Sequence, residues 1–364
     1  MKTNTNSLSS LALQKFKKNT TGVFSFWFIV VVGFIAVFAY LLAPDNSPNA
    51  NEMHLEIHSK KPGFSVLMLH LPTENKVQQS FFNKLFYGNK NSSQEIPIKS
   101  YIASENEITY QPFSNSSDDT STKSVSLLKF NDKPISSIVK KKKFYLGTDK
   151  YGRDLLSRVL IGTRISFFIG FVAVFISLVI GISIGAIAGY FGGKVDAFIM
   201  WLINITWSIP TLLLVIAITL ALGKGFWQVF IAVGLTMWVE VARVVRGQIM
   251  STKQMQYVEA AKALGFSDFR IIFNHILPNI MAPVIVISAA NFAAAILIES
   301  GLSFLGIGAQ PPTPSWGAMI KDHYSYIILG KAYLAIIPGL AIMSLVMAFM
   351  LIGNALRDAL DVKS

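Results

Sequence analysis

The sequence predicts an all-α polytopic membrane protein with an inserted β-rich domain outside the membrane, and three observations lead to this fold class. Of the 364 residues, 52% are hydrophobic and 14% are charged, whereas soluble domains are about one quarter charged. The apolar residues gather in runs of about 20 residues, the length that crosses a bilayer core as a helix. Between the first two runs, short alternating stretches are typical of strands.

Six membrane-spanning helices account for the apolar runs. The first run follows Lys15, Lys17 and Lys18, but it is longer than the apolar core of a signal peptide. We therefore interpret it as an uncleaved span. The six spans are expected at Val23–Leu42, Ile165–Gly189, Ala197–Leu222, Trp227–Val245, Ala282–Leu305 and Ala332–Gly353.

Basic residues predict the orientation, because loops that stay in the cytoplasm are enriched in Lys and Arg. The loop between the fourth and fifth spans holds Lys253, Lys262 and Arg270, so we expect it, and both termini, on the cytoplasmic side. The lysine run Lys140 to Lys143 falls in the long outer region, where charge affects orientation little. The predicted segments are a cytoplasmic tail (1–22), the first span (23–42), the outer β-rich insertion (44–145), a five-helix core (146–358) with its cytoplasmic loop (247–280), and a cytoplasmic tail (359–364).

The outer region is predicted to be a small β-rich domain. Its alternating stretches are "MHLEIH", "FSVLMLHL", "EIPIKSYI" and "SVSLLKF", and one helix is expected near Gln79–Phe86. The clusters "GNKNSSQ" and "SNSSDDTS" have the composition of disordered chain, so a loosely ordered spacer is the alternative.

A ridge of small residues runs along the second span. Ala173, Ser177, Gly181, Gly185 and Gly189 follow one another at intervals of four, which places them on one face of a helix. Small residues let two membrane helices approach closely. We therefore expect Gly181, Gly185 and Gly189 to form a helix-packing face.

The sequence offers no chemistry of its own. "GGKVD" lacks the upstream glycine and the hydroxyl of a phosphate-binding loop, and no histidine pattern fits zinc. His54 and His58 are four apart, but "MHLEIH" is predicted as a strand, so no metal site is expected. No nucleophile elbow appears, and no cysteine is present. We expect no catalytic residue, cofactor or metal in this chain.

The net charge of +12 does not indicate nucleic-acid binding, because the basic residues flank spans and leave no folded basic domain. Two acids lie near membrane depth, where carboxylates are expensive and usually functional. Glu240 is expected to pair with Arg243 on the same helix face, and Glu299 lies near the outer end of the fifth span. Each is either a structural partner or part of a proton or ion relay.

A short broken helix pair interrupts the apolar spans between Tyr257 and Asn279. The first helix, Tyr257–Leu264, ends at Gly265, where a left-handed residue closes a helix, and Ser267 caps the second helix. Pro278 is expected to stop the second helix. The side chains at Phe269, Ile272, Phe273, Ile276 and Leu277 are expected to form one apolar stripe.

Here the residues carry a family resemblance. "EAAKALG" from Glu259 to Gly265, followed by "HILP", resembles the coupling loop of ABC importer permeases. The resemblance implies ATPase-coupling roles for Glu259, Ala260, Ala261, Gly265, His275, Leu277 and Pro278.

Two further stretches resemble the second permease subunit of dipeptide and oligopeptide importers, a group that includes nickel and glutathione importers. "LGTDKYGRDLLSRVLIGTRIS" precedes the second span with motif residues Gly147, Thr148, Asp149, Gly152, Arg153 and Asp154. "ESGLSFLGIGAQPPTPSWGAMI" follows the fifth span with Glu299, Phe304, Leu305, Gly306, Gly308, Pro314, Trp316 and Gly317.

The resemblance implies a non-catalytic permease of an ATP-binding cassette importer in a bacterial inner membrane. It implies a homologous second permease, two ATP-binding subunits that hold ATP and Mg, and an extracytoplasmic solute-binding protein, with import of di- or oligopeptides by alternating access. The alternatives are a permease for nickel or another small solute, an ion-coupled transporter, and a membrane-anchored sensor or scaffold acting through residues 44–145. This outer region is longer than the family pattern, and it is expected to contact the binding protein, cover the path, replace docking surface, or be a tolerated insertion.

Overall fold

The fold is described by a computed structural model over residues 8–72, 78–90, 94–104, 106–114, 121–130, 134–223 and 225–360. The ends of both predicted tails and most of "SNSSDDTS" lie outside these residues. The chain divides into two compact units. The first unit holds Met1–Gly33, Ser166–Gln310 and Leu340–Ser364, and the second holds Phe34–Ile165 and Pro311–Gly339.

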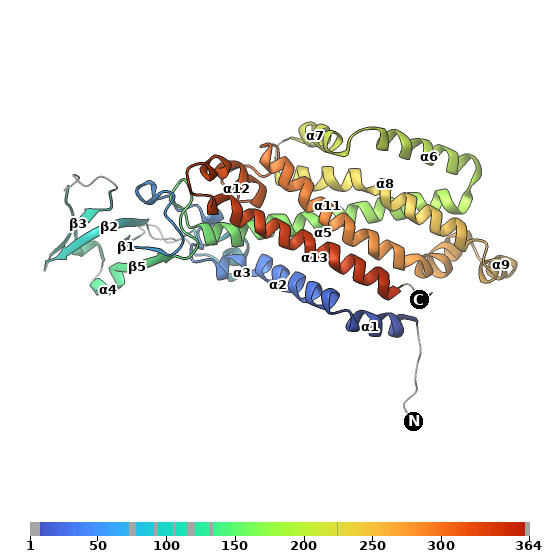
Figure 1. Cartoon of the computed structure of the whole chain (residues 1–364), viewed down its shortest axis with the longest axis horizontal. Helices are drawn as coiled ribbons and strands as arrows, with labels where there is room; N and C mark the ends of the chain where they lie inside the picture. The colour runs from blue at the N-terminus through green and yellow to red at the C-terminus, as the bar shows by residue number, and fades with distance from the viewer. Residues whose placement is uncertain are drawn as a thin grey trace, which may run out of the picture. The chain divides into compact units, whose positions relative to one another are not determined.

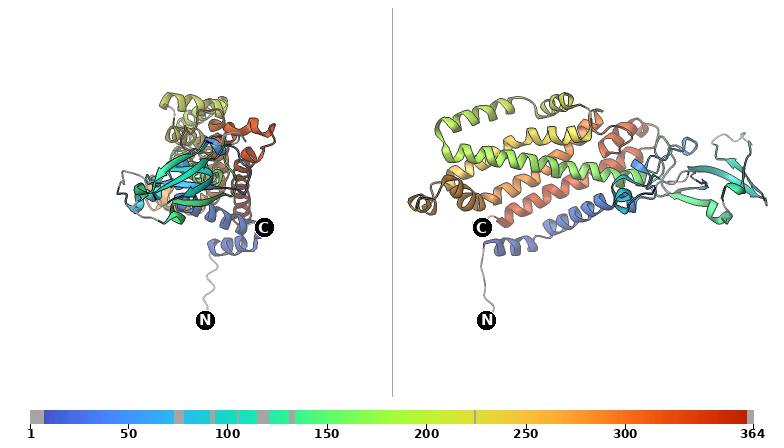
Figure 2. Two further views of the ribbon diagram at one scale, coloured as in Figure 1. Left: turned by 90° about the vertical axis from the view of Figure 1, so that its left-hand side faces the viewer. Right: turned by 180° about the vertical axis from the view of Figure 1, so that it is seen from behind.

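The first unit is a bundle of long apolar helices, and α5, α8, α11 and α13 run side by side in it (Figures 1 and 2). Among the described residues, five helical segments are long and apolar enough to cross a membrane, or six if α6 and α7 count as one. The helices that build or enter this unit are α1 (Leu8–Lys18), α2 (Thr20–Leu42), α5 (Leu155–Phe191), α6 (Gly193–Ser208), α7 (Thr211–Leu222), α8 (Phe226–Thr252), α9 (Gln256–Ala263), α10 (Asp268–Arg270), α11 (Met281–Phe304) and α13 (Tyr333–Leu360).

The third span is broken, which corrects the continuous helix expected over Ala197–Leu222. Helices α6 and α7 meet at 92°. Ile209 before the break is extended, with φ −92° and ψ 127°. A residue that precedes proline is pushed out of the helical region, and Pro210 here acts on Ile209 in this way.

The glycine ridge of α5 packs against α8. A methyl group added at Gly185 would stand 2.5 Å from the carbonyl oxygen of Ala242, and one at Gly189 would stand 2.7 Å from that of Arg246. Gly181 meets Val241 and the carbonyl of Trp238 in the same way. The two backbones thus touch along one seam, as small residues permit between membrane helices.

The second unit contains a small antiparallel sheet in the strand order β4-β3-β2-β1-β5 (Figure 1). One face packs Leu69, Ile98 and Ile108 against Phe130 and Ile138. Its elements are η1 (Pro48–Ala50), η2 (Leu55–Ile57), β1 (Phe64–Leu71), α3 (Phe81–Tyr87), β2 (Gln94–Ala103), β3 (Glu107–Pro112), β4 (Lys123–Ser126), η3 (Leu127–Phe130), α4 (Ile135–Ile138), β5 (Val139–Phe144), α12 (Trp316–His323) and η6 (Tyr324–Ile327).

The strand predictions succeed in part. "FSVLMLHL" and "EIPIKSYI" are β1 and β2, and the helix predicted near Gln79–Phe86 is α3. "SVSLLKF" divides into β4 and the turn η3, and "MHLEIH" is wrong, because it forms the 3₁₀ turn η2. The lysine run is the edge strand β5, where charged side chains deter pairing with another chain.

The opposite face of the sheet packs on the segment that follows α2. Val66, Met68 and Phe144 surround the fully buried Ile57 of η2. The sheet therefore shares a core with η2, although the alternating pattern of "MHLEIH" predicted that this segment would be a strand.

Candidate functional sites

The turn between α9 and α10 is built by local backbone chemistry. Gly265 has φ +75°, and its N–H donates to the carbonyl of Lys262 at 2.9 Å, while the N–H of Phe266 donates to the carbonyl of Ala261 at 3.2 Å. These two bonds form a Schellman motif, which needs a left-handed residue at the glycine position. The sequence therefore folds into a helical hairpin, α9–turn–α10, hereafter the α9–α10 hairpin.

Side chains fasten this hairpin to α5. The Ser267 hydroxyl accepts a hydrogen bond from the N–H of Arg270 at 3.4 Å, which is the predicted cap. The Tyr190 hydroxyl of α5 donates to the Asp268 carboxylate at 2.6 Å, and Lys253 donates to the Tyr190 carbonyl. The sequence did not predict this role for Tyr190, because its partner Asp268 lies 78 positions away in the chain and no local pattern links the two residues.

One side of the hairpin is buried and the other is not. Val258, Ala261, Ile271, Ile272 and Ile276 join Val245 and Ile249 of α8 in one core. Leu264 is 73% exposed and Phe269 is 70% exposed. The rings of Phe269 and Phe273 lie against each other with centroids 4.3 Å apart. Leu264, Phe269 and Phe273 thus form an exposed apolar surface, hereafter the hairpin surface.

This division corrects the single stripe predicted for the second helix. Residues Ile271–Ile276 form a π-helix, η4, in which hydrogen bonds run from i to i+5. The wider turn separates Ile272 and Ile276, which are buried, from Phe269 and Phe273, which are exposed.

Pro278 does not stop the helix, contrary to prediction. It lies in the first turn of the 3₁₀ segment η5 (Leu277–Ile280), where a missing N–H costs nothing. The chain continues into α11, and Asp268–Phe304 forms one apolar helical stretch. The hairpin is therefore joined directly to a spanning helix.

The remaining residues of the candidate coupling loop line both sides of the hairpin. Glu259 and Ala260 are exposed, Leu277 is half-buried and Pro278 is exposed. The His275 ring stacks on Phe266 with centroids 5.6 Å apart, and its carbonyl accepts from the side-chain amide of Asn279 at 2.6 Å.

In the second unit, the motif before the second span forms a tight cradle for residues 54–60. Gly147 and Gly152 both have positive φ, and a Cβ at Gly152 would stand 1.7 Å from the carbonyl oxygen of His54. The Thr148 hydroxyl accepts from the N–H of Lys60 at 2.9 Å and donates to the carbonyl of Ile57 at 2.5 Å. These motif residues therefore bind the backbone of residues 54–60 and not a ligand.

A buried charge cluster closes the cradle. Asp149 is fully buried; its carboxylate accepts from the N–H of Tyr151 at 2.8 Å and from Nε of Arg153 at 2.7 Å. Buried charges persist only when paired and hydrogen-bonded. The N–H of Ser157 donates to Asp154 at 2.9 Å, and burial nevertheless raises the pKa of Asp154.

The motif after the fifth span begins in the first unit, where the buried Glu299 accepts hydrogen bonds from serine hydroxyls. The Ser303 hydroxyl donates to Glu299 at 2.7 Å and accepts from the N–H of Ala309 at 3.2 Å. Gly306 has φ +81°, and a Cβ at Gly308 would stand 2.2 Å from the Ser303 hydroxyl oxygen. Phe304 and Leu305 are exposed.

The second half of that motif lies in the second unit, where Pro314, Trp316 and Gly317 are buried. The indole Nε1 of Trp316 donates to the carbonyl of Val159 at 3.0 Å. Lys150 pairs with Asp322 at 3.1 Å, and the Lys150 N–H donates to Nε2 of His323 at 3.3 Å. The second half of this motif thus meets the motif that precedes the second span, within one unit.

A second charged cluster lies between the sheet and residues 52–54. The Lys142 ammonium lies 2.5 Å from Glu95 and 4.0 Å from Glu52. Burial acts to lower the pKa of Lys142, but the Glu95 carboxylate outweighs it and the pKa is raised. Glu52, His54 and Glu95 offer ligand atoms within 4.8 Å of one another, and the lysine ammonium supplies the positive charge beside them.

Glu240 lines a cavity of about 220 Å³ at the break between α6 and α7. The expected pairing with Arg243 is wrong for the described residues: the Arg243 guanidinium lies 3.6 Å from the centre of the Trp207 ring and donates to Asn204 at 3.3 Å. Thr206, Thr211 and Thr236 share the lining with apolar side chains such as Leu214 and Met237, so the broken span opens a niche of mixed polarity. The hydroxyls of Thr206 and Thr236 donate to the carbonyls of Leu202 and Val233.

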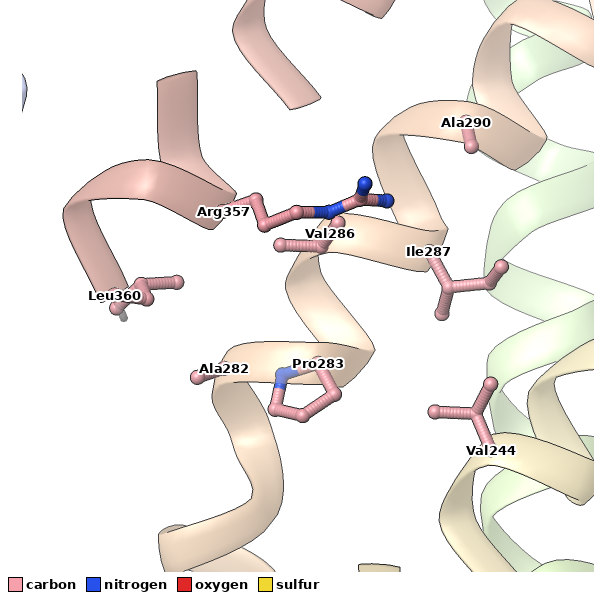
Figure 3. Close-up of a pocket in the computed structure, with 8 residues that line it drawn as sticks. All are labelled: Val244, Ala282, Pro283, Val286, Ile287, Ala290, Arg357 and Leu360. Atoms are coloured by element: carbon pink, nitrogen blue, oxygen red, sulfur yellow. The ribbon is translucent and has the colours of Figure 1, made fainter. Parts of the chain in front are cut away.

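A larger hollow of about 410 Å³ lies among α8, α11 and α13. Figure 3 shows Arg357 extending from α13 across to α11, beside Val286. Small and branched apolar side chains, including Ala282, Pro283 and Ile287, make up the rest of the lining.

Comparison with known proteins was made against family models, curated relatives and solved structures. The model described as "Binding-protein-dependent transport system inner membrane component" matches residues 181–363, and that of the "N-terminal TM domain of oligopeptide transport permease C" matches residues 7–62. The inserted sheet lies in the interval that neither model covers.

Two curated relatives share 41% identity over 219 residues, which is 60% of this chain. The glutathione transport system permease protein GsiD of Pectobacterium atrosepticum is covered over 72% of its length, and the dipeptide transport system permease protein DppC of Bacillus subtilis over 68%. A chain of the inward-facing MetNI methionine ABC transporter is 18% identical with a TM-score of 0.47, over 56% of this chain and 95% of that one.

Proposed function

Because the chain belongs to the family of binding-protein-dependent transport system inner membrane components, we propose that it is one of two homologous permease subunits in an ATP-driven importer of di- or oligopeptides. Two ATP-binding subunits and an extracytoplasmic solute-binding protein complete the proposed assembly. Nucleotide and Mg belong to the ATP-binding subunits, since this sequence lacks a phosphate-binding loop.

The observation that carries this proposal is the hairpin surface. Leu264, Phe269 and Phe273 are exposed beside a turn that two backbone hydrogen bonds close, and exposed apolar clusters mark sites of protein or membrane interaction. The buried side of the hairpin shares a core with α8 and continues into α11. A bound ATPase that shifts the hairpin therefore displaces two spanning helices, which is the coupling that alternating access requires.

The proposed orientation places the hairpin and both termini in the cytoplasm of a bacterial inner membrane. Lys253, Lys262 and Arg270 in the hairpin region support this orientation by the positive-inside rule. The inserted sheet then faces the solute-binding protein.

Glutathione is the second candidate cargo. The relatives named for glutathione and for dipeptides are equally similar to this chain, and glutathione is itself a tripeptide. Glu240 and Thr211, which line the cavity at the α6–α7 break, are polar side chains of the kind that bind peptide termini and amides.

The test is purification of the tagged chain in mild detergent, followed by mass spectrometry of the proteins that accompany it. An ATPase and a homologous permease are the expected companions. Uptake of labelled dipeptides, glutathione or nickel by the reconstituted assembly then identifies the cargo. Recovery of the chain with signalling or envelope proteins alone would instead favour a scaffold, and uptake abolished by an ionophore with ATP intact would favour ion coupling.

A further inference from the structure

Helix α3 of the second unit exposes an unusual number of aromatic side chains. Phe81, Phe82, Phe86 and Tyr87 are between 46% and 67% exposed, whereas Leu85 is buried. The rings of Phe81 and Phe82 lie against each other with centroids 6.0 Å apart, and Phe86 follows Phe82 one turn along the helix. These three side chains are hereafter the aromatic face; Tyr87 lies on another side of this seven-residue helix. Exposed clusters of large apolar side chains mark interaction sites.

The contacts of α3 fix where this face lies. The Arg164 guanidinium of α5 donates to the Phe86 carbonyl at 2.8 Å and stands 5.2 Å from the centre of the Tyr40 ring. A Cβ at Gly88, just after α3, would stand 2.9 Å from Tyr40. The N–H of Asn89 also donates to the carbonyl of Asn46, at 2.7 Å. Helix α3 is therefore fastened to the last turn of α2.

The last turn of α2 lies at the edge of the bilayer. The 23 residues of α2, which is kinked at Phe38, rise at most about 35 Å, compared with a hydrocarbon core about 30 Å thick. Tyr40 then stands at the level of the lipid headgroups, where aromatic residues with a polar tip concentrate. Leu41 and Leu42 beside it are about half exposed, so apolar surface is available next to α3.

The polar groups near α3 also suit the headgroup region. Lys84 lies within the helix and Lys90 follows it. A hollow of about 330 Å³ beside Tyr87 is lined by Gln78, Gln79, Asn83 and Lys90. Cations and amides meet phosphates and glycerol esters favourably, while the rings reach the acyl boundary.

We propose that α3 is an interfacial anchor, which inserts the aromatic face into the outer leaflet of the membrane and holds the second unit at the bilayer surface. The segment lies between the regions that the two family models match, so the anchor is a property of the insertion. The occupant of the aromatic face is lipid, because α3 is tied to a membrane-spanning helix at headgroup depth.

The absence of cysteine from the chain allows a direct test. Phe82→Cys carries one nitroxide label on the aromatic face, and Ile102→Cys, at a position 73% exposed on β2, is the matched control. Both proteins are placed in nanodiscs of phosphatidylethanolamine and phosphatidylglycerol, and collision rates are measured with oxygen, which favours lipid, and with a water-soluble nickel chelate.

The ratio of oxygen to nickel collisions is expected to be several-fold higher at position 82 than at position 102. Equal ratios at the two positions would overturn the proposal. A water-exposed label at position 82 that becomes immobile only when a solute-binding protein is added would also overturn it, in favour of a protein partner. Phe86→Cys repeats the measurement one turn along, so that failure of one variant to fold leaves the test intact.

Discussion

The indole of Trp316 donates a hydrogen bond to the carbonyl of Val159, 157 positions earlier in the chain. Trp316 begins α12, and Val159 lies in the second turn of α5. Gly162 of α5 makes room for the indole, because a Cβ there would stand 3.2 Å from the ring. The earlier motif and the second half of the later motif, both in the second unit, thus meet at this hydrogen bond.

Replacing Trp316 tests that site. Trp316→Phe removes the donor but keeps most of the buried ring, and we expect a loss of about 1 kcal/mol in the free energy of unfolding. Trp316→Ala also leaves a cavity, for a loss of about 3 kcal/mol or more. Thermal unfolding in detergent measures both, with Trp227→Phe, at an exposed position, as the control. Equal melting temperatures for all three variants would contradict the assignment.

Two glycines with the same φ allow the cost of backbone strain to be measured separately from the cost of steric overlap. Gly152 and Gly265 both have φ +75°, but a Cβ at Gly152 meets the His54 carbonyl at 1.7 Å, whereas a Cβ at Gly265 meets nothing within 4 Å. Gly265→Ala is expected to cost only the left-handed strain, about 1 kcal/mol. Gly152→Ala adds overpacking and is expected to cost about 3 kcal/mol or more. Similar losses in the free energy of unfolding at both positions would show that the backbone around Gly152 shifts to accommodate the added methyl group.

The open space at Gly265 makes a larger substitution informative. Gly265→Trp is expected to leave membrane insertion and the helical content nearly unchanged, because a Cβ there meets nothing within 4 Å and the left-handed strain costs only about 1 kcal/mol. ATP-driven uptake is expected to fall strongly, since the indole obstructs a docked ATPase. Uptake by reconstituted Gly265→Trp at the wild-type rate would count heavily against a coupling role.

If the proposed ATPase subunit docks on the hairpin surface, Phe269 should contribute to its binding energy. Phe269→Ala truncates a ring that is 70% exposed, so the isolated chain should lose little stability. Aromatic anchors at interfaces contribute about 2 kcal/mol or more, so the affinity for the ATPase should fall about thirtyfold. Phe175→Ala, on an exposed position of α5, is the control. Affinity titrations that do not distinguish Phe269→Ala from the control would place the docking surface elsewhere.

How much of this arrangement the sequence could predict depends on how local its cause is. The turn at Gly265 and the cap at Ser267 follow from neighbouring residues, and both were predictable. The burial of Ile272 without Phe273 depends on a π-helix, and the pairing of the lysine-rich β5 with β1 depends on distant chain. The bond from Trp316 to Val159 is likewise non-local, and residue patterns alone do not predict it.

Acid should weaken the second unit through His323. Burial lowers the pKa of this histidine, aided by Lys150 and opposed by Met319, Asp149 and Asp322. The neutral ring donates from Nδ1 to the Met319 carbonyl at 2.7 Å and accepts the Lys150 N–H at Nε2. The unfolded chain binds a proton below about pH 6.5, so this contribution to stability is present above that pH and is lost as the pH falls toward the lowered pKa.

Melting temperatures from about pH 7.5 to about pH 5.5 should therefore fall with acid, and His323→Asn should make the dependence shallower. The exposed His58 supplies the control, His58→Asn, which should keep the wild-type slope. A slope that His323→Asn leaves unchanged would assign the acid sensitivity to other groups, His54 first, because its pKa is lowered by burial as well.

The chain enters and leaves the inserted sheet at neighbouring positions, so the insertion can be removed. The N–H of Gly63 donates to the carbonyl of Phe144 at 2.9 Å, so residues 64–144 can be excised and the ends joined by a short glycine linker. Deleting Met53–Lys140 instead would remove residues such as Ile57 and Lys60, to which Thr148 is bound, and would damage the cradle.

The excised variant should still insert and bind the ATPase, because the hairpin surface lies in the first unit. Because the excision also removes α3, a fall in uptake and in affinity for the solute-binding protein, with basal ATP hydrolysis by the assembly retained, would assign the role to the insertion as a whole. Unchanged uptake and unchanged affinity would show that the insertion is a tolerated decoration. The excision exposes Ile57, because Val66 and Met68, which pack against it, are removed. Ile57→Ser in the excised variant replaces this exposed apolar side chain and so limits aggregation of the variant.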